Sequence, residues 1–371
     1  MILLSSLIKT FEAQFLAQYG DSITSLQRQA LSAMKSCRTS ASPLMQAQCI
    51  ECDHTLLAPH SCGHRLCPHC QHHESQQWLE NQLKKQVPAH YFLLTFTLPA
   101  ELRALARNHQ RLVYDLLIRC SWETVKTFSQ NDRQLQGTPG AIAVLHTHSR
   151  RLDYHPHVHL VMPAAALQIE KKLWRTKKGN DNGPYLFHYK ALAKVFRAKM
   201  LQGIAKAGLL LPDDCPATWV VDVKSVGSGE KALVYLGRYL YRGVVQEKEI
   251  IACDNGQVTF RYRNSKTKKI EKRTLLGAEF LALLLQHVLP KGFRRARQFG
   301  FLHPNSKRLI GLLQYLLGFD PQRIVKQLKA RPGLTCPCCG APMVVVKTRL
   351  PAPDAPPLPI PIQQQLALSV M

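Results

Sequence analysis

The chain has 371 residues, which is long enough for two or three domains with buried cores. Its 49 Lys and Arg residues outnumber its 24 Asp and Glu residues, so the formal charge at pH 7 is +25. Such an excess is costly in self-repulsion unless a polyanion offsets it, and nucleic acid is the leading candidate. The most apolar late stretch, Leu275–Leu289, is too short to span a bilayer, which excludes a membrane protein. No signal peptide is evident, so we expect a protein of the bacterial cytoplasm, at the nucleoid.

The N-terminal region carries the first metal-binding pattern. Residues 1–34 predict one or two amphipathic helices. Two knuckle-like pairs follow, Cys49-x-x-Cys52 and Cys67-Pro-His-Cys70, whereas a redox motif would give only one pair. We predict that these four thiolates bind one structural zinc ion, in a chain whose twelve cysteines stay reduced. Three donors between the pairs are left open as a replacement ligand, a ligand of a second ion or neither: His60, Cys62 and His64.

Helical and strand patterns alternate through the middle of the chain. Tyr91–Leu98 is a buried-type strand that ends at Pro99. Residues 101–128 have apolar side chains at helical spacing and predict a long helix that covers one face of a sheet. We further expect helices over residues 75–87 and 188–207, an exposed basic loop over 171–184 and a strand over 218–224.

Residues 141–163 predict a β-hairpin rich in histidine. Side chains alternate on a strand, so His157 and His159 project from one face, about 6–7 Å apart. An isolated His-x-His is more often half-buried and hydrogen bonded, but five histidines fall within fourteen residues here. This density favours a divalent-metal site. The third ligand is left open among three candidates, with the neighbouring strand preferred: His146, then His155 and Glu230.

A second candidate for chemistry is the stretch Ser228–Arg242, which predicts a helix. On that helix Tyr235 and Tyr239 are four residues apart and share a face. One tyrosine alone would be interpreted as a core aromatic residue, but two tyrosines beside cations are an unusual way to build a core. The cations on or beside this face are Lys231, Arg238 and Arg242.

Two later stretches are strongly basic. Gln257–Arg273 predicts a β-hairpin with a basic turn, and Lys291–Arg308 has no acidic residue but holds Phe293, Phe299 and Phe301. Cations interleaved with aromatic rings suit phosphate contact and base stacking on single strands. A solvated charged face is the alternative for either stretch alone. The arginines that we assign to DNA binding are Arg261, Arg263, Arg294, Arg295 and Arg297.

The C-terminal region holds half of a further zinc knuckle. The run Cys336-Pro-Cys338-Cys339 has no second pair after it, so a distant cysteine partner and no metal at all are both left open. Residues 351–361 are proline-rich and predict an unstructured tail. We expect four segments: N-terminal helices and a zinc-binding module in 1–85, a nuclease domain in 86–250, a basic DNA-binding region in 251–330, and the cysteine segment and tail in 331–371.

Taken together, these motifs resemble those of the insertion sequence 91 family of transposases, which belong to the HUH endonuclease superfamily. The resemblance spans about Ala47 to Leu309 and depends on the order of its motifs. These are SCGHRLCPHCQ, FTLP, LHT, HPHVHLVMP, YLGRY and the run Arg294–Leu302. The chain departs from the expected pattern at Leu66, where the resemblance predicts a histidine.

The resemblance implies an α+β fold with an HUH-type central antiparallel sheet, flanking helices and a preceding small zinc-binding module. It implies that His157 and His159 hold Mg²⁺ or Mn²⁺, which orients the scissile phosphate. Tyr235 or Tyr239 would then attack and leave a 5′-phosphotyrosine and a free 3′-OH. Two tyrosines suit rolling-circle transposition of a single strand, and the sequence does not say which one acts first.

The expected partners are single-stranded DNA and the DNA of the element ends, while a host helicase and the oligomeric state are left open. Two other functions compete with the transposase. A rolling-circle replication initiator would use the same chemistry, and a non-catalytic zinc-containing regulator would only bind DNA. The zinc module and the long basic C-terminal region favour the transposase over the initiator. A covalent protein–DNA adduct separates either enzyme from the regulator.

Overall fold

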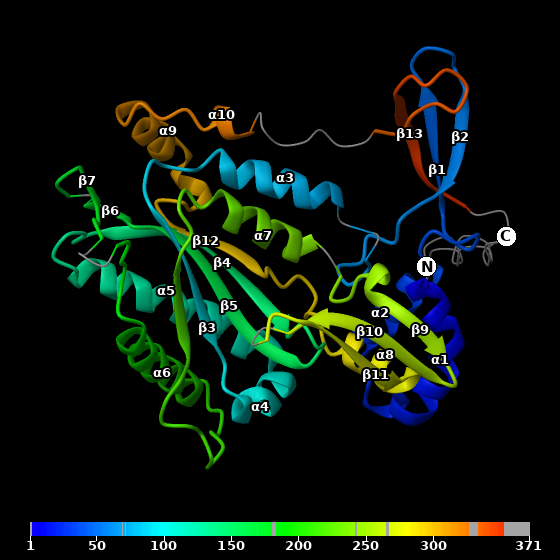
Figure 1. The fold of residues 1–371 in the computed structure, drawn as a ribbon, viewed down its shortest axis with the longest axis horizontal. Helices are drawn as coiled ribbons and strands as arrows, with labels where there is room; N and C mark the ends of the chain where they lie inside the picture. The colour runs from blue at the N-terminus through cyan, green and yellow to red at the C-terminus, as the bar shows by residue number, and fades with distance from the viewer. Residues whose placement is uncertain are drawn as a thin grey trace, which may run out of the picture.

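The computed structural model has a central sheet, a second body of helices and strands, and a small sheet built from both ends of the chain (Figure 1). It describes residues 2–68, 70, 72–168, 170–179, 183–241, 243–264, 267–325 and 333–351. Only the backbone is described for His72, His73, Arg238, Tyr239 and Tyr241. None of the helices in these ranges combines the length and the apolar character that crossing a bilayer requires.

The central sheet has seven strands in the order β7-β6-β4-β5-β3-β8, with β12 also paired to β4. Its pairings are antiparallel throughout the described residues. The histidine-rich strand β5 therefore lies inside the sheet, where hydrogen bonds on both sides fix the direction of its side chains. The bounds are β3 (Tyr91–Thr97), β4 (Thr138–His148), β5 (Tyr154–Pro163), β6 (Ala165–Gln168), β7 (Leu173–Thr176), β8 (Val221–Ser225) and β12 (Ala296–Gly300).

Strand alternation gives the central sheet two apolar faces. Leu94, Leu145 and Leu160 belong to the largest core, with the helices α4, α5 and α6 (Figure 1). Val144 and Val161 point the other way, into a core shared with α3 and α7. The helix bounds are α3 (His72–Leu83), α4 (Arg103–Asn108), α5 (Gln110–Asn131), α6 (Tyr189–Lys206) and α7 (Glu230–Tyr241).

The N-terminal helices fold together with the segment that follows α7. Phe11 and Phe15 share one core with Phe260 and Phe280, and a Cβ atom added at Gly277 would lie 2.2 Å from the Phe11 ring. This close approach explains the glycine at that position. The elements of this body are α1 (Leu4–Tyr19), α2 (Ser25–Ser36), α8 (Gly277–Leu285), β9 (Ile250–Asp254), β10 (Gln257–Arg263) and β11 (Ile270–Leu276).

A third unit joins the two ends of the described chain. Strand β1 (Leu44–Cys49) pairs with β2 (Thr55–Pro59) on one side and with β13 (Met343–Leu350) on the other. Figure 1 shows the late strand β13, in red, beside the early blue strands. We call these three strands the terminal sheet.

The predicted α+β fold with a central antiparallel sheet and a zinc-binding module is confirmed, and its element positions mostly agree with the sequence. The predicted helix 101–128 is interrupted at His109, whose backbone is not helical. Part of the predicted loop 171–184 is strand β7. The segment predicted as one basic region, 251–330, is divided: β9 to β11 and α8 pack on the N-terminal helices, whereas β12 joins the central sheet. The predicted proline-rich tail lies outside the described residues beyond Pro351.

The remaining elements are short helices that cover edges of these units. They are the helices α9 (Lys307–Leu316) and α10 (Gln322–Val325), and the 3-10 turns η1 (Gly20–Ser22), η2 (Ala100–Leu102), η3 (Glu247–Glu249) and η4 (Pro304–Ser306). Of these, η3 fixes the start of α1, because the buried Glu247 carboxylate accepts a hydrogen bond from the Leu4 amide at 2.6 Å. A carboxylate at a helix N-terminus also suits the helix dipole.

Candidate metal and nucleophile site

Three histidines meet on the face of the central sheet that α7 covers. His146 on β4 lies directly opposite His157 on β5, and His159 follows on the same face of β5. The ring of His146 lies 5.1 Å from that of His157 and 4.4 Å from that of His159, centroid to centroid. One ligand atom of each residue lies within 4.8 Å of the other two. We call these three residues the histidine triad, and their spacing suits one divalent ion.

Two rings of the histidine triad are held by hydrogen bonds at Nδ1. Thr95 Oγ1 on β3 lies 2.9 Å from His159 Nδ1, because β3 pairs with β5 at this register. His157 Nδ1 lies 2.7 Å from the backbone oxygen of His155, which can only accept. His157 therefore carries its proton on Nδ1 and keeps the lone pair of Nε2 for a ligand. This donor chemistry fits a metal ion.

Burial keeps the imidazoles of the histidine triad neutral. It lowers the pKa of His157 to about 3, with the neighbouring His159 as the next cause. Burial, followed by the charge of Lys224, lowers the pKa of His159 to about 4. Burial and the two other rings also hold the pKa of His146 well below its usual value. Neutral imidazole is the form that binds a metal, so the triad needs no proton loss at neutral pH.

A further histidine pair lies beside the histidine triad, in which His287 is buried and His148 is half-buried. The ring of His148 lies 5.2 Å from that of His287 on the segment after α8. His287 has Thr147 Oγ1 and the Leu152 carbonyl oxygen as partners, each at 3.2 Å. Burial lowers the pKa of His287 to about 4. This pair joins the turn of the histidine hairpin to the N-terminal body.

We expect the free energy of unfolding to fall as the pH drops from about 6.5 towards 4. In this window the unfolded histidines bind protons that the folded chain excludes, so acid favours unfolding by about 1.4 kcal/mol per pH unit for each buried histidine. His287→Gln should reduce the slope by about one such increment, because the folded pKa of His287 is about 4. Urea titrations across this pH range measure the slope. The exposed His188→Gln variant should leave it unchanged, and an unaltered slope in His287→Gln would contradict the expectation.

Helix α7 places Tyr235 over the histidine triad. Leu233, Leu236 and Leu240 are buried in the core between α7 and the sheet, which fixes the rotation of the helix. The Tyr235 ring then lies 5.9 Å from the ring of His159 and 6.4 Å from that of His146. Tyr235 is still 43% exposed, so the residue that lies over the histidine triad is open to solvent.

The surroundings of Tyr235 act on its phenol in opposite directions. Partial burial raises the pKa of Tyr235, while the charges of Arg150 and Lys224 lower it. Lys224 also pairs with Asp222 at 3.0 Å, and Arg150 donates to the backbone oxygen of Arg263 at 3.4 Å. The phenol is therefore protonated near neutral pH, and the two cations favour the loss of its proton.

The other predicted residues of α7 are placed less completely. Tyr239 and Arg238 lie on α7, but their side chains fall outside what the structure describes, and Arg242 lies outside the described residues altogether. Lys231 is exposed on the same helix. Only Tyr235 of the two tyrosines can therefore be placed against the histidine triad.

Among the three candidate third ligands, the structure brings His146 to the pair on β5. His155 is turned towards Arg103, whose guanidinium lies 2.9 Å from its Nδ1. Glu230, in the first turn of α7, is outside the group of donors within reach of one ion among the described residues. Of the three candidates, His146 is thus the one with a ligand atom within 4.8 Å of those of His157 and His159.

The predicted DNA-binding arginines differ in their surroundings. Arg261 pairs with Glu249 at 2.8 Å, and the Arg297 guanidinium pairs with Asp115 and lies over the Phe293 ring. Arg263 and Arg294 are exposed. The charges of Arg261 and Arg297 are therefore offset by carboxylates of the same molecule, whereas those of Arg263 and Arg294 face solvent.

The aromatic residues of the same segment are not available for base stacking as predicted. Phe293 and Phe301 are buried in two different cores, and Phe299 stacks on Trp122 at 5.0 Å. Strand β12 joins the central sheet, so Phe299 on the strand and the flanking Phe293 and Phe301 pack against the molecule, which explains the difference. Arg295 instead lines a cavity of about 330 Å³ beside Arg65.

Eight of the twelve cysteines form two groups of four, and this corrects the single predicted zinc site. The chain from Cys49 and Cys52 runs along β2, away from the turn, before it reaches Cys67 and Cys70. One group is Cys37, Cys62, Cys67 and Cys70, and the other is Cys49, Cys52, Cys336 and Cys339. The predicted set therefore contributes one half to each group.

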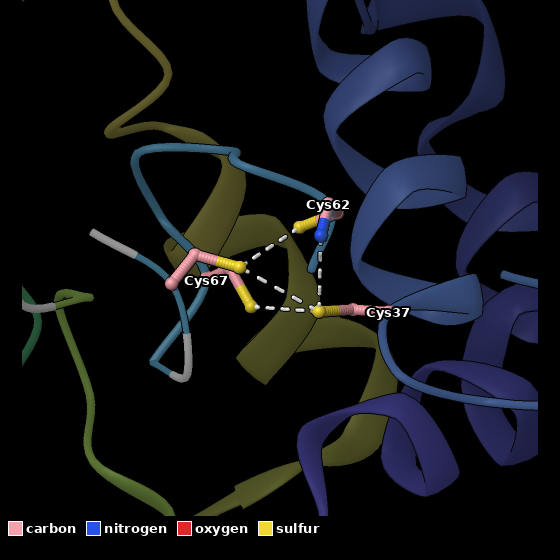
Figure 2. A group of neighbouring side chains, drawn as sticks. Cys37, Cys62 and Cys67 are labelled. Atoms are coloured by element: carbon pink, nitrogen blue, oxygen red, sulfur yellow. Dashed lines mark hydrogen bonds between the residues drawn. The ribbon is translucent and has the colours of Figure 1, made fainter. Parts of the chain in front are cut away.

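The first group lies where the zinc-binding segment meets α2. Figure 2 shows Cys37, at the end of that helix, turned towards Cys62 and Cys67. The Sγ atom of Cys37 lies 3.5 Å from that of Cys67 and 3.6 Å from that of Cys70. An ideal tetrahedron with Zn–S bonds of about 2.3 Å has edges of about 3.8 Å, so the four thiols fit zinc. Leu66 is buried beside them, and Cys37 makes a histidine ligand at that position unnecessary.

Comparisons with known proteins match two parts of the chain to transposase families. Residues 140–309 match the family model described as putative transposase, and residues 7–98 match the one described as transposase zinc-binding domain. The chain is 33% identical over 306 residues to the putative transposase y4qJ of Sinorhizobium fredii, covering 76% of this chain and 75% of that one. It is 28% identical over 343 residues to the transposase for insertion sequence element IS801 of Pseudomonas savastanoi pv. phaseolicola, covering 86% of this chain and 78% of that one.

Solved structures with some likeness include the conjugative relaxase TrwC in complex with oriT DNA, in metal-bound form. That likeness has a TM-score of 0.27 at 14% identity and covers 62% of this chain and 73% of the relaxase.

The central sheet and the cysteine-rich N-terminal module are thus those of a transposase with a zinc-binding domain. More narrowly, the chain belongs to the insertion sequence 91 family of transposases.

Proposed function

We propose that this transposase nicks and joins single-stranded DNA at the ends of its element, in rolling-circle transposition, with Tyr235 as a nucleophile. The observation that carries the proposal is the position of the Tyr235 ring, 5.9 Å from His159 and 6.4 Å from His146. A phenol beside three neutral imidazoles brings a nucleophile and a phosphate-orienting metal site to one place.

The chemistry divides between the histidine triad and Tyr235. The triad would hold Mg²⁺ or Mn²⁺, and an ion bound there would supply Lewis-acid polarisation of the scissile phosphate. The Tyr235 oxygen attacks the phosphorus after its proton leaves to solvent, and the bond from phosphorus to the 3′ oxygen breaks. The products are a 5′-phosphotyrosine and a strand with a free 3′-OH, so no bond energy is lost to hydrolysis. The 3′-OH of another strand can reverse the step and complete the joining.

Tyr239, one helical turn further along α7, is proposed as the second nucleophile because the family's chemistry uses two tyrosines on one helix. While one tyrosine holds a strand end covalently, the other can attack a second strand. Lys231, Arg263 and Arg294 are proposed to contact the DNA backbone, since each is exposed.

The first group of cysteines, completed by Cys37, is proposed to hold the structural zinc ion of the zinc-binding domain. The ion would fix the loop that holds Cys62 and Cys67 against the end of α2. The same loop carries Arg65, whose guanidinium donates to the backbone oxygen of Phe293 at 2.7 Å. The zinc module is thereby connected to the segment that enters β12.

We expect Thr95→Val to weaken the binding of Mn²⁺ by about 10- to 100-fold, because His159 loses the hydrogen bond that orients its ring. Titration of the purified protein with Mn²⁺, followed by electron paramagnetic resonance, measures this affinity. Thr97→Val is the matched control: Thr97 lies two residues along β3, opposite His157, and among the described residues its side chain makes no hydrogen bond to a histidine ring like that of Thr95. Equal affinities for the two variants would rule out this role for Thr95.

The proposed function is tested by incubating the protein with a single-stranded oligonucleotide that carries an element end, in the presence of Mn²⁺. A protein–DNA adduct that survives denaturation, together with a fragment bearing a free 3′-OH, is the expected result. The absence of any adduct on every cognate end would contradict the proposal and leave a zinc protein that only binds DNA.

A further inference from the structure

The second group of cysteines is built from two turns at opposite ends of the chain. Cys49 and Cys52 belong to the turn between β1 and β2, and Cys336 and Cys339 to the turn that precedes β13. Cys49 and Cys339 are 290 positions apart in the sequence. All four sulfur atoms nevertheless lie within 4.8 Å of one another.

The spacing of these sulfur atoms suits a metal ion and not a disulfide. The Sγ atoms of Cys49 and Cys339 lie 3.5 Å apart, and those of Cys52 and Cys336 lie 3.6 Å apart. A disulfide would require about 2.05 Å, whereas a tetrahedral zinc site has sulfur–sulfur edges of about 3.8 Å. The distances match those of the first group, where Cys37 and Cys70 lie 3.6 Å apart.

The two turns share one backbone pattern, although their sequences differ. In each, an amide two residues after the first cysteine points at its sulfur at 3.4 Å: Glu51 to Cys49, and Cys338 to Cys336. In each, the first cysteine donates its own amide to the carbonyl five residues later, to His54 at 2.9 Å and to Ala341 at 2.8 Å. Amides aimed at a sulfur favour its thiolate form, which is the form that binds metal.

The terminal sheet has too small an apolar core to hold three strands by itself. Its buried members are Ala47, Cys49, Cys336 and Met343. The outer side chains of β13 are exposed instead, with Val344 at 54%. A unit of this size is usually stabilised by a structural metal or a disulfide, and its cysteines are free. A metal ion bound by the four thiols would therefore supply the stability that the small apolar core does not provide.

We propose that Cys49, Cys52, Cys336 and Cys339 bind a second zinc ion, which fastens the C-terminal strand β13 to the N-terminal hairpin of β1 and β2. Cys336 and Cys339 lie outside the residue spans 7–98 and 140–309 that the two family models match. The ion closes the chain into a loop, so that β13 stays paired with β1 while the strands of the central sheet lie between them in the sequence.

Measuring the zinc content of the purified full-length protein tests this proposal. The wild-type chain should hold about two zinc ions, and the double variant Cys336→Ser, Cys339→Ser about one. Cys338→Ser is the matched control, because Cys338 lies in the same turn but outside the group of four, and it should keep both ions. The reciprocal double variant Cys62→Ser, Cys67→Ser should also keep one. A wild-type content of one ion, or two ions in Cys336→Ser, Cys339→Ser, would overturn the proposal.

X-ray absorption at the zinc edge keeps the proposal testable if a double variant does not fold. For the wild-type protein with two ions, we expect four sulfur neighbours per zinc and no nitrogen or oxygen neighbour. An average shell that includes nitrogen or oxygen would show that the four thiols of the terminal sheet do not hold the second ion. Neither measurement depends on DNA cleavage, so the result is independent of the proposed function.

Discussion

Replacement of Tyr235 by phenylalanine is expected to lower the rate of covalent adduct formation by at least about a thousand-fold, because it removes the only oxygen on that side chain that can attack phosphorus. The fold should tolerate the change, since Tyr235 is 43% exposed and its ring stays the same size. Denaturing gel analysis of the protein with an end-labelled oligonucleotide and Mn²⁺ measures the adduct directly.

Two further variants make the Tyr235 result interpretable. Tyr315→Phe, at an 83% exposed tyrosine on α9, should leave adduct formation unchanged and controls for loss of a phenol elsewhere. Tyr239→Phe tests the second proposed nucleophile on the same helix. If Tyr239 takes part only in strand joining, this variant still forms the first adduct but fails to release it. Undiminished adduct in Tyr235→Phe would show that the phenol beside the histidine triad is not the first nucleophile.

The histidine hairpin could be predicted from the sequence because its information is local. Alternation places His157 and His159 on one face, and the short turn brings His146 opposite His157. Thr95 was not predicted, because the register between β3 and β5 depends on two strands that are far apart in sequence. The rotation of α7 about its axis, by contrast, can be predicted from the sequence. Its apolar side chains pack on the sheet, and this packing places Tyr235 over the histidine triad.

The grouping of the cysteines, by contrast, depends on contacts between segments that are far apart in the sequence. The pairs Cys49/Cys52 and Cys67/Cys70 are close in sequence, so a single site was the simplest prediction. Cys37 is a lone cysteine at the end of α2, and only folding brings it to the second pair. The number of cysteines does offer a signal. The two knuckle pairs together with Cys37, Cys62 and the C-terminal pair Cys336 and Cys339 make eight thiols, which is enough for two complete sets of four ligands. The spacing of the cysteines does not show, however, that the hairpin of β1 and β2 holds Cys49 and Cys52 away from Cys67 and Cys70.

The packing of the N-terminal helices on β9 to β11 could not be predicted for a related reason. An amphipathic helix shows which of its faces is buried but not what covers that face. Phe11 and Phe15 share a core with Phe260 and Phe280, which lie about two thirds of the chain length further along the sequence. The basic hairpin then serves partly as structure: Arg273 on β11 pairs with Asp153 at 2.7 Å and so holds the turn of the histidine hairpin.

His157→Ala is expected to lower the rate of DNA cleavage by about a hundred-fold or more, while the affinity for DNA changes little. The imidazole is one of three donors to a single ion, and the loss of one donor from a three-histidine set removes the geometry that orients the phosphate. His157 is a strand residue between two hydrogen-bonded neighbours, so its backbone stays in place. Adduct formation is measured at saturating DNA over a range of Mn²⁺ concentrations, and binding by fluorescence anisotropy of a labelled oligonucleotide.

A control variant separates the loss of a ligand from a general disturbance of the strand. His155→Ala changes the next histidine on the same face of β5, whose Nδ1 lies by Arg103 and whose ring is 5.1 Å from that of His157. The backbone oxygen that holds His157 Nδ1 is kept in this variant. His155→Ala should retain most of the cleavage activity at the same Mn²⁺ concentrations. Equal losses in His155→Ala and His157→Ala would point to damage of β5 as a whole, and retained cleavage in His157→Ala would remove the histidine triad from the reaction. Weakened binding without loss of cleavage would assign these imidazoles to DNA contact instead.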